Sequence, residues 1–252
     1  MNGLRVLPLV IATEAAKLKR TLALGMTVIA PLVIVILYFL VGLAGSGGVT
    51  RAGTDSWAFL TRNTVQLWTL LMLPLFITLE TSLLAGLEHT ERNWKFLLSL
   101  PIPRWTIYAA KLIVVIGLIW LAHAVLAAGT LVSGYVLKQL APALKLGALP
   151  ISQIAWPLTR VSLALVLAVT IQHWVSLRWP SFVVAMGFGM CAMVVGFIAA
   201  NSAQYGPWVP WSLTLHTLMP RGTAIVSPML FSTVAGLLVA IAGAIHFTRH
   251  EK

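Results

Sequence analysis

Four long stretches of this chain contain no aspartate, glutamate, lysine or arginine: residues 21–50, 112–137, 179–220 and 222–248. Each stretch is longer than the roughly 20 apolar residues with which an α-helix crosses the hydrocarbon core of a bilayer. A soluble domain carries about 25% charged residues, whereas 9% of this chain is charged and 59% is hydrophobic. The sequence therefore predicts an integral membrane protein and excludes a soluble globule.

An all-α fold follows from the needs of the backbone in lipid, where a helix satisfies its own hydrogen-bonding groups. The strands of a membrane barrel would alternate apolar and polar residues, whereas residues 27–43 are apolar on every face. We predict a single transmembrane domain over residues 1–252 with six transmembrane helices. The expected helices cover residues 22–44, 65–87, 105–132, 156–177, 181–200 and 223–247.

Two further segments have patterns of their own. In residues 1–21, apolar side chains recur at spacings of three and four, at Leu4, Leu7, Ile11, Ala15 and Leu18. Glu14 and Lys17 lie off that stripe, which predicts an amphipathic helix on the inner membrane surface. The alternative is a basic flank that orients the first span. Residues 201–222 are broken by Gly206 and Pro207 and predict an outer interfacial segment.

The orientation follows from the positive charges, because lysine and arginine near span ends are retained on the cytoplasmic side. With both termini inside, eleven of the 17 lysines and arginines are cytoplasmic and six are outside. We therefore expect a multi-pass protein of the cell inner (cytoplasmic) membrane with both termini cytoplasmic. Topology and attraction to anionic lipid account for the net charge of +11, so the lipid bilayer is an expected partner and nucleic acid is not.

The loop between the second and third spans, residues 88–104, is the most distinctive segment. In this loop, two acidic residues each precede a basic residue by four positions: Glu88 precedes Arg92, and Glu91 precedes Lys95. Such pairs stabilise a short helix, Trp94 could anchor its apolar side, and Pro101 prevents its continuation into the next span. We expect a cytoplasmic helix with an exposed, charged outer face that contacts another protein. A plain interfacial loop is the alternative.

The same region resembles the membrane (permease) subunits of type-2 ABC transporters, most closely those of lantibiotic immunity and antibiotic-peptide export. The matching positions are Glu88, Trp94, Lys95, Pro101, Arg104 and Lys111. The resemblance implies that residues 88–104 form a coupling helix that docks on a separate ATP-binding cassette subunit. Glu91 and Arg92 are added to this site by their position in the loop. It also implies ATP-driven export, with ATP and Mg²⁺ on the partner subunit.

The motifs of the chain agree with a transporter whose membrane part and ATP-binding part are separate subunits. It lacks the G-x-x-x-x-G-K-[ST] loop that cradles phosphates, so we expect a transport subunit that is not itself an enzyme and carries no cofactor. The single cysteine, Cys191, excludes a multi-thiolate metal site within one chain. Because six spans enclose little volume, two subunits should form the substrate pathway, either as identical copies or with a sister permease.

Two other functions stay open at this stage. An ion-coupled secondary carrier would use Glu80, the one acidic residue within an expected span, and an intramembrane enzyme would use Glu80, His123 or His173. Glu80 should face the subunit interior or the pathway, because an ionised carboxylate in lipid costs about 2.5–3.5 kcal/mol; a structural hydrogen bond is the alternative role. The outer tryptophans suit an amphiphilic peptide or hydrophobic cargo, although an interfacial belt explains them equally well.

Overall fold

A computed structural model describes residues 3–19, 21–44, 56–90, 101–140, 146, 151–219 and 226–250. Within these residues the regular structure is entirely helical, and six helices are long and apolar enough to cross a membrane. The prediction of an all-α membrane protein with six transmembrane helices is therefore confirmed.

The second span is assembled from three consecutive helical segments, and the remaining spans are single helices. The elements are α1 (Gly3–Lys17), α2 (Leu22–Leu43), α3 (Ser56–Leu67), η1 (Trp68–Met72), α4 (Leu73–Thr90), α6 (Arg104–Leu140), α7 (Ile151–Arg178), α8 (Phe182–Ala199), η3 (Gly206–Trp208), α9 (Leu213–Leu218) and α10 (Val226–His250).

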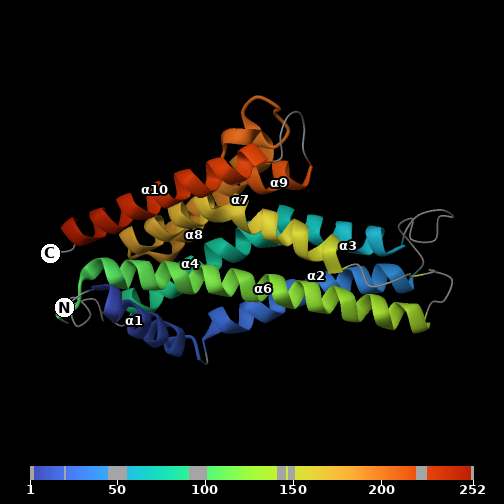
Figure 1. The fold of residues 1–252 in the computed structure, drawn as a ribbon, viewed down its shortest axis with the longest axis horizontal. Helices are drawn as coiled ribbons and strands as arrows, with labels where there is room; N and C mark the ends of the chain where they lie inside the picture. The colour runs from blue at the N-terminus through green and yellow to red at the C-terminus, as the bar shows by residue number, and fades with distance from the viewer. Residues whose placement is uncertain are drawn as a thin grey trace.

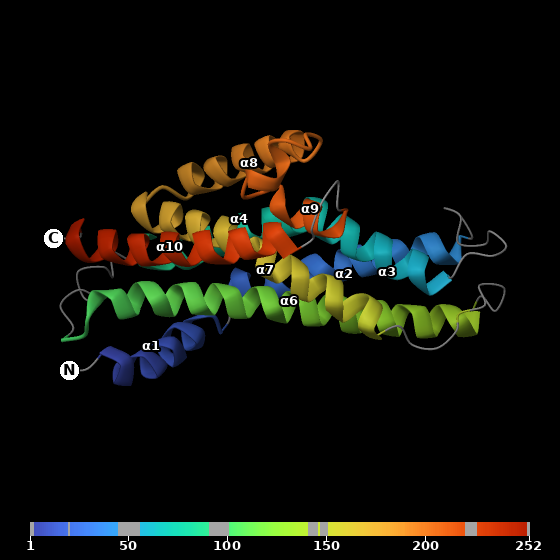
Figure 2. The ribbon, with the colours of Figure 1, turned by 45° about the horizontal axis from the view of Figure 1, so that its top comes forward.

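The spans form an elongated bundle in which α6 runs along almost the whole length (Figure 1). The short helix α1 lies beside the first half of α6, and its beginning is at the same end of the bundle as the end of α10 (Figure 2). An even number of spans requires this placement of the two ends. The end of α4 and the start of α6 are therefore at the end of the bundle that also carries α1.

The second span is interrupted at η1, a π-helical turn over Trp68–Met72. Pro74 lies two residues after this turn, and because proline has no backbone N–H it cannot donate the regular hydrogen bond to the turn before it. The side chain of Trp68 is fully buried here. Its ring centroid lies 5.8 Å from that of Phe76 and 6.1 Å from that of His123 on α6. The wide turn thus positions a tryptophan between two spans.

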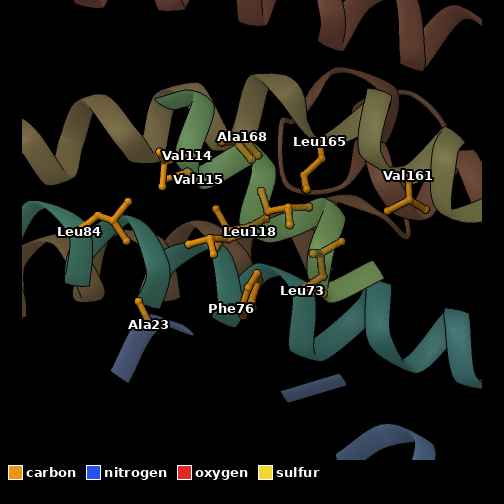
Figure 3. Packing of buried hydrophobic residues seen from close by; sticks show 14 of the residues in the cluster. Ala23, Leu73, Phe76, Leu84, Val114, Val115, Leu118, Val161, Leu165 and Ala168 are labelled. Carbon is orange, nitrogen blue, oxygen red and sulfur yellow. The ribbon is translucent and has the colours of Figure 1, made fainter. Parts of the chain in front are cut away.

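The main core lies where α4, α6 and α7 meet, with α2 at its edge (Figure 3). Its labelled residues are Ala23, Leu73, Phe76, Leu84, Val114, Val115, Leu118, Val161, Leu165 and Ala168. Helix α10 packs on α7 through small residues: a Cβ atom at Gly236 would lie 2.9 Å from the backbone nitrogen of Leu167. Ser232 donates a hydrogen bond to the carbonyl of Ala164 at 2.8 Å. Close packing of this kind is typical of membrane helices.

The segment between α8 and α10 folds into two short helices, η3 and α9, and contributes no span within its described residues. Ser212 donates a hydrogen bond to the carbonyl of Gly206 at 2.5 Å, which holds the two helices together. Arg160 on α7 donates to the carbonyl of Thr217 on α9. This segment is therefore attached to the bundle through α7.

Candidate functional site

Four charged side chains from three helices meet beside the loop that joins α4 and α6. Lys17 Nζ lies 2.6 Å from both Glu14 Oε1 and Glu88 Oε1. Lys111 Nζ lies 2.6 Å from Glu14 Oε2 and 3.1 Å from Glu88 Oε1. Each ammonium group therefore contacts both carboxylates, and the two positive and two negative charges balance. We call these four residues the ion cluster.

The helices bring these residues together in a simple way. Glu14 and Lys17 are one turn apart on α1, so they lie on the same face. Glu88 is in the last turn of α4, and Lys111 is two turns into α6. Helix α1 approaches α6 closely at its other end as well, because a Cβ atom at Gly3 would lie 2.6 Å from the ring of Trp105. The ion cluster and this contact fix α1 along α6.

Burial makes the pairing obligatory. The side chains of Lys111, Glu88 and Glu14 are 1%, 2% and 5% exposed, whereas that of Lys17 is 30% exposed. An isolated buried charge costs several kcal/mol, so the cluster is tolerated because every member is paired. Burial by itself would lower the pKa of Lys17, but its hydrogen bonds to Glu14 and Glu88 outweigh that effect and raise the pKa above the ordinary value of 10.5. Lys17 is therefore charged at neutral pH.

The expected exposed position of Glu88 is wrong. Its described ion pairs run inward to Lys17 and Lys111, because the end of α4 turns this side chain toward α1 and α6, and its expected partner Arg92 lies outside the described residues. Glu14 also lies off the apolar stripe of α1, as the sequence indicates, yet it is buried against the bundle. Leu4, on the stripe, is exposed. Helix α1 thus has a protein-facing side as well as an apolar side.

Sequence reasoning missed the contribution of Glu14 and Lys17. Glu14 is 97 residues from Lys111, and Lys17 is 71 residues from Glu88, so no local spacing connects them. A signal was nevertheless present in the charge count. The chain has six acidic residues, and four of them, Glu14, Glu88, Glu91 and Glu251, flank spans at the face expected to be cytoplasmic. Because acidic residues are rare in the chain as a whole, those at this face are expected to have basic partners there.

The other residues expected at the coupling loop lie at its edges or beyond the described part of the chain. Arg104 is the first residue of α6 and is half-buried, and Pro101 is exposed three residues earlier. Glu91, Arg92, Trp94 and Lys95 lie outside the described residues. In the first turn of α6, the hydroxyl of Thr106 donates a hydrogen bond to the carbonyl of Pro103 at 2.6 Å.

Glu80 lies in the middle of α4 and is fully buried. Neither of its carboxylate oxygens has a hydrogen-bond partner among the described residues. The hydroxyls of Thr78 and Thr81 donate instead to the backbone carbonyls of Pro74 and Ile77, each at 2.8 Å. A buried carboxyl group without a local partner is costly, which marks Glu80 as a position that the fold alone does not explain.

The histidines of the alternative enzyme hypothesis make ordinary packing contacts. His123 Nδ1 lies 2.9 Å from the hydroxyl of Ser162 on α7. His173 Nε2 lies 3.3 Å from the carbonyl of Tyr108, and the two rings stack edge to face with centroids 4.8 Å apart. In the part of the chain that the structure describes, no group of three histidine, cysteine, aspartate or glutamate residues is placed to hold a metal ion.

The model of a family described as ABC-2 family transporter protein matches residues 10–199, from α1 to the end of α8. The chain belongs to this family. This ABC-2 protein is accordingly a multi-pass membrane protein and a permease subunit of an ABC exporter, a class that lacks an ATPase site of its own and generally works with an ATP-binding subunit. Neither a curated protein nor a solved structure matches the chain.

Proposed function

We propose that this permease is driven by ATP hydrolysis on a separate subunit that docks on residues 88–104, and that the ion cluster transmits the docking movement. The observation that carries the proposal is the placement of Glu88 and Lys111. One lies at the end of the helix that enters the loop, the other near the start of the helix that leaves it, and both are paired with Glu14 on α1 or its neighbour Lys17.

In this arrangement, a displacement of the loop moves α1, α4 and α6 together. Each ammonium group contacts carboxylates on two helices, so separating any pair of these helices breaks an ion pair of the cluster. The ends of α4 and α6 therefore respond to the loop as one unit. Helix α4 continues toward Glu80 and the π-helical turn, which gives the movement a route into the membrane-spanning part.

The remaining loop residues supply the docking surface in this proposal. Glu91, Arg92, Trp94 and Lys95 contact the ATP-binding subunit, Pro101 ends the loop helix, and Arg104 begins the next span. ATP and Mg²⁺ are bound by the partner. Glu88 and Lys111 act from behind this surface, because their buried side chains cannot contact a docked protein directly.

Two permease copies, or this chain and a sister permease, form the pathway in the proposed transporter. Large apolar side chains on α8, among them Val183 and Ile198, are exposed and must be covered by lipid or by the second subunit. The cargo is an amphiphilic peptide or hydrophobic compound, in keeping with the resemblance to antibiotic-peptide permeases, and the protein resides in the inner membrane with both termini cytoplasmic. Glu80 is the candidate residue for the pathway.

Site-directed cross-linking tests the docking site in the intact transporter. A cysteine at Thr90 or Asn93 should cross-link to the ATP-binding subunit in membranes, and the yield should change when ATP is added. A cysteine at Arg178 is the matched control, because this residue is exposed at the end of α7 and is expected on the same cytoplasmic face. Cross-links that form from Arg178 and from neither loop position would contradict the proposal.

A further inference from the structure

A cavity of about 280 Å³ lies between α3, α7 and α9, in the half of the bundle away from the chain ends. Residues at positions 58, 61, 62, 65 and 66 of α3 line one wall, and residues at 153, 157 and 160 of α7 line the facing wall. These spacings of three and four place each set on one face of its helix. The cavity is therefore built by two helix faces and not by a loop.

The charges of this cavity are one-sided. Arg62 and Arg160 both line it, together with Gln66 and Gln153. The carboxylates of the described residues belong to Glu14, Glu80 and Glu88, and none of the three lines the cavity. Arg160 donates to the carbonyl of Thr217, but its Nε is buried without a hydrogen-bond partner. Two guanidinium groups facing one cavity favour an anionic ligand and oppose a cationic one.

A second cavity of about 130 Å³ adjoins the first, because Gln66 and Met219 line both. The amide of Gln66 contacts the sulfur of Met219 at 3.8 Å across the shared wall. Beyond that contact, the second cavity is lined mainly by the apolar side chains of Leu70, Phe197, Ala200 and Leu215, with Asn201 and His216 as its polar members. A basic compartment is thus joined to a largely apolar one by two flexible side chains.

We propose that the two cavities together bind an anionic phospholipid. Its phosphate lies between Arg62 and Arg160, whose planar guanidinium groups match phosphate geometry, and an acyl chain passes Gln66 and Met219 into the apolar cavity. The first cavity is close to the lower limit of small-molecule sites, about 300 Å³, so it takes a headgroup and not a whole lipid. This proposal is independent of the ATP coupling proposed above, because it concerns binding by the isolated chain.

Native mass spectrometry of the detergent-purified full chain tests the site. The chain is titrated separately with phosphatidylglycerol, phosphatidylcholine and diacylglycerol. Phosphatidylglycerol should bind most tightly, and its Kd should rise about tenfold or more in the double variant Arg62→Gln/Arg160→Gln, since each lost charge-assisted bond weakens binding substantially. Arg62→Gln alone, an exposed substitution that leaves the Arg160 contact with Thr217 intact, should raise the Kd severalfold.

Arg178→Gln is the matched control, because it removes the same charge from an exposed position at the other end of α7. Its Kd for phosphatidylglycerol should equal that of the wild type. An equal Kd in the wild type and in Arg62→Gln and the double variant would overturn the proposal, as would equal binding of diacylglycerol. Displacement of the lipid by an equimolar amount of inorganic phosphate would also overturn it, since the site would then recognise a free anion without a tail.

Discussion

Lys111 is the residue whose environment is the most demanding. Its ammonium group is almost completely buried in a membrane protein, and its hydrogen bonds reach Glu14 at 2.6 Å and Glu88 at 3.1 Å. Lys17 contacts the same two carboxylates but is 30% exposed, so water shares in its solvation. The two lysines therefore have the same partners and different degrees of burial. This difference makes them a natural matched pair for mutation.

Lys111→Met should destabilise the chain by about 3–5 kcal/mol, because it leaves a buried negative charge uncompensated. Lys17→Met should cost clearly less, since Lys17 is 30% exposed and water can enter the space that its ammonium group leaves. Thermal unfolding in detergent measures both. The double variant Lys111→Met/Glu14→Gln should recover part of the loss by restoring the charge balance. Equal destabilisation by the two lysine variants would contradict the described burial.

Glu80→Gln should leave the protein folded and reduce transport severalfold if the carboxyl group serves the pathway. The amide keeps the size of the side chain and removes the possibility of a charge, which lipid disfavours by about 2.5–3.5 kcal/mol. Transport assays on the reconstituted complex measure the effect, with Ser82→Ala as the control, because Ser82 is a buried neighbour that also lacks a described hydrogen-bond partner. Wild-type transport with unchanged pH dependence in Glu80→Gln would remove this residue from the pathway.

At the scale of elements, the apolar runs predict the six spans well because hydrophobic length is a local property of the sequence. The interruption of the second span is different. The apolar run around Trp68 predicts a continuous helix, whereas the structure has a π-helical turn just before Pro74 that places Trp68 between Phe76 and His123, which lies on another span. The helix of the third span, α6, also continues to Leu140, which is eight residues past the end of the expected span.

Part of the candidate site can also be predicted, because that part depends on a local pattern in the sequence. Glu88 and Lys111 could be singled out through resemblance to a family signature, which is a local pattern. Their burial and their pairing with Glu14 and Lys17 depend on how α1 docks on the bundle, and helix periodicity describes a face without saying what covers it. The paired cavities around Gln66 and Met219 likewise depend on the position of α9 against α3, which no spacing within either helix encodes.

At the scale of the whole molecule, the chain supplies a membrane domain without a nucleotide-binding motif in its sequence. We expect the purified chain to show no ATPase activity and to co-purify from native membranes with a separate ATP-binding protein. Activity assays on the chain alone and on the co-purified complex measure this. The control is a complex whose partner subunit lacks the lysine of the G-x-x-x-x-G-K-[ST] loop. This complex should not hydrolyse ATP. Tight ATP binding by the isolated chain would contradict the prediction that ATP is bound by a separate subunit.

The ion cluster also has a consequence for biosynthesis. Glu14 and Lys17 leave the ribosome early and can pair with each other, because they are one turn apart on α1. Glu88 and Lys111 are synthesised only after most of the second span and the start of the third. Helix α1 therefore cannot complete its docking until the third span has begun to insert, although it is synthesised before the six spans. The pairing of α1 with Glu88 and Lys111 therefore requires that the second span and the start of the third span are already in place.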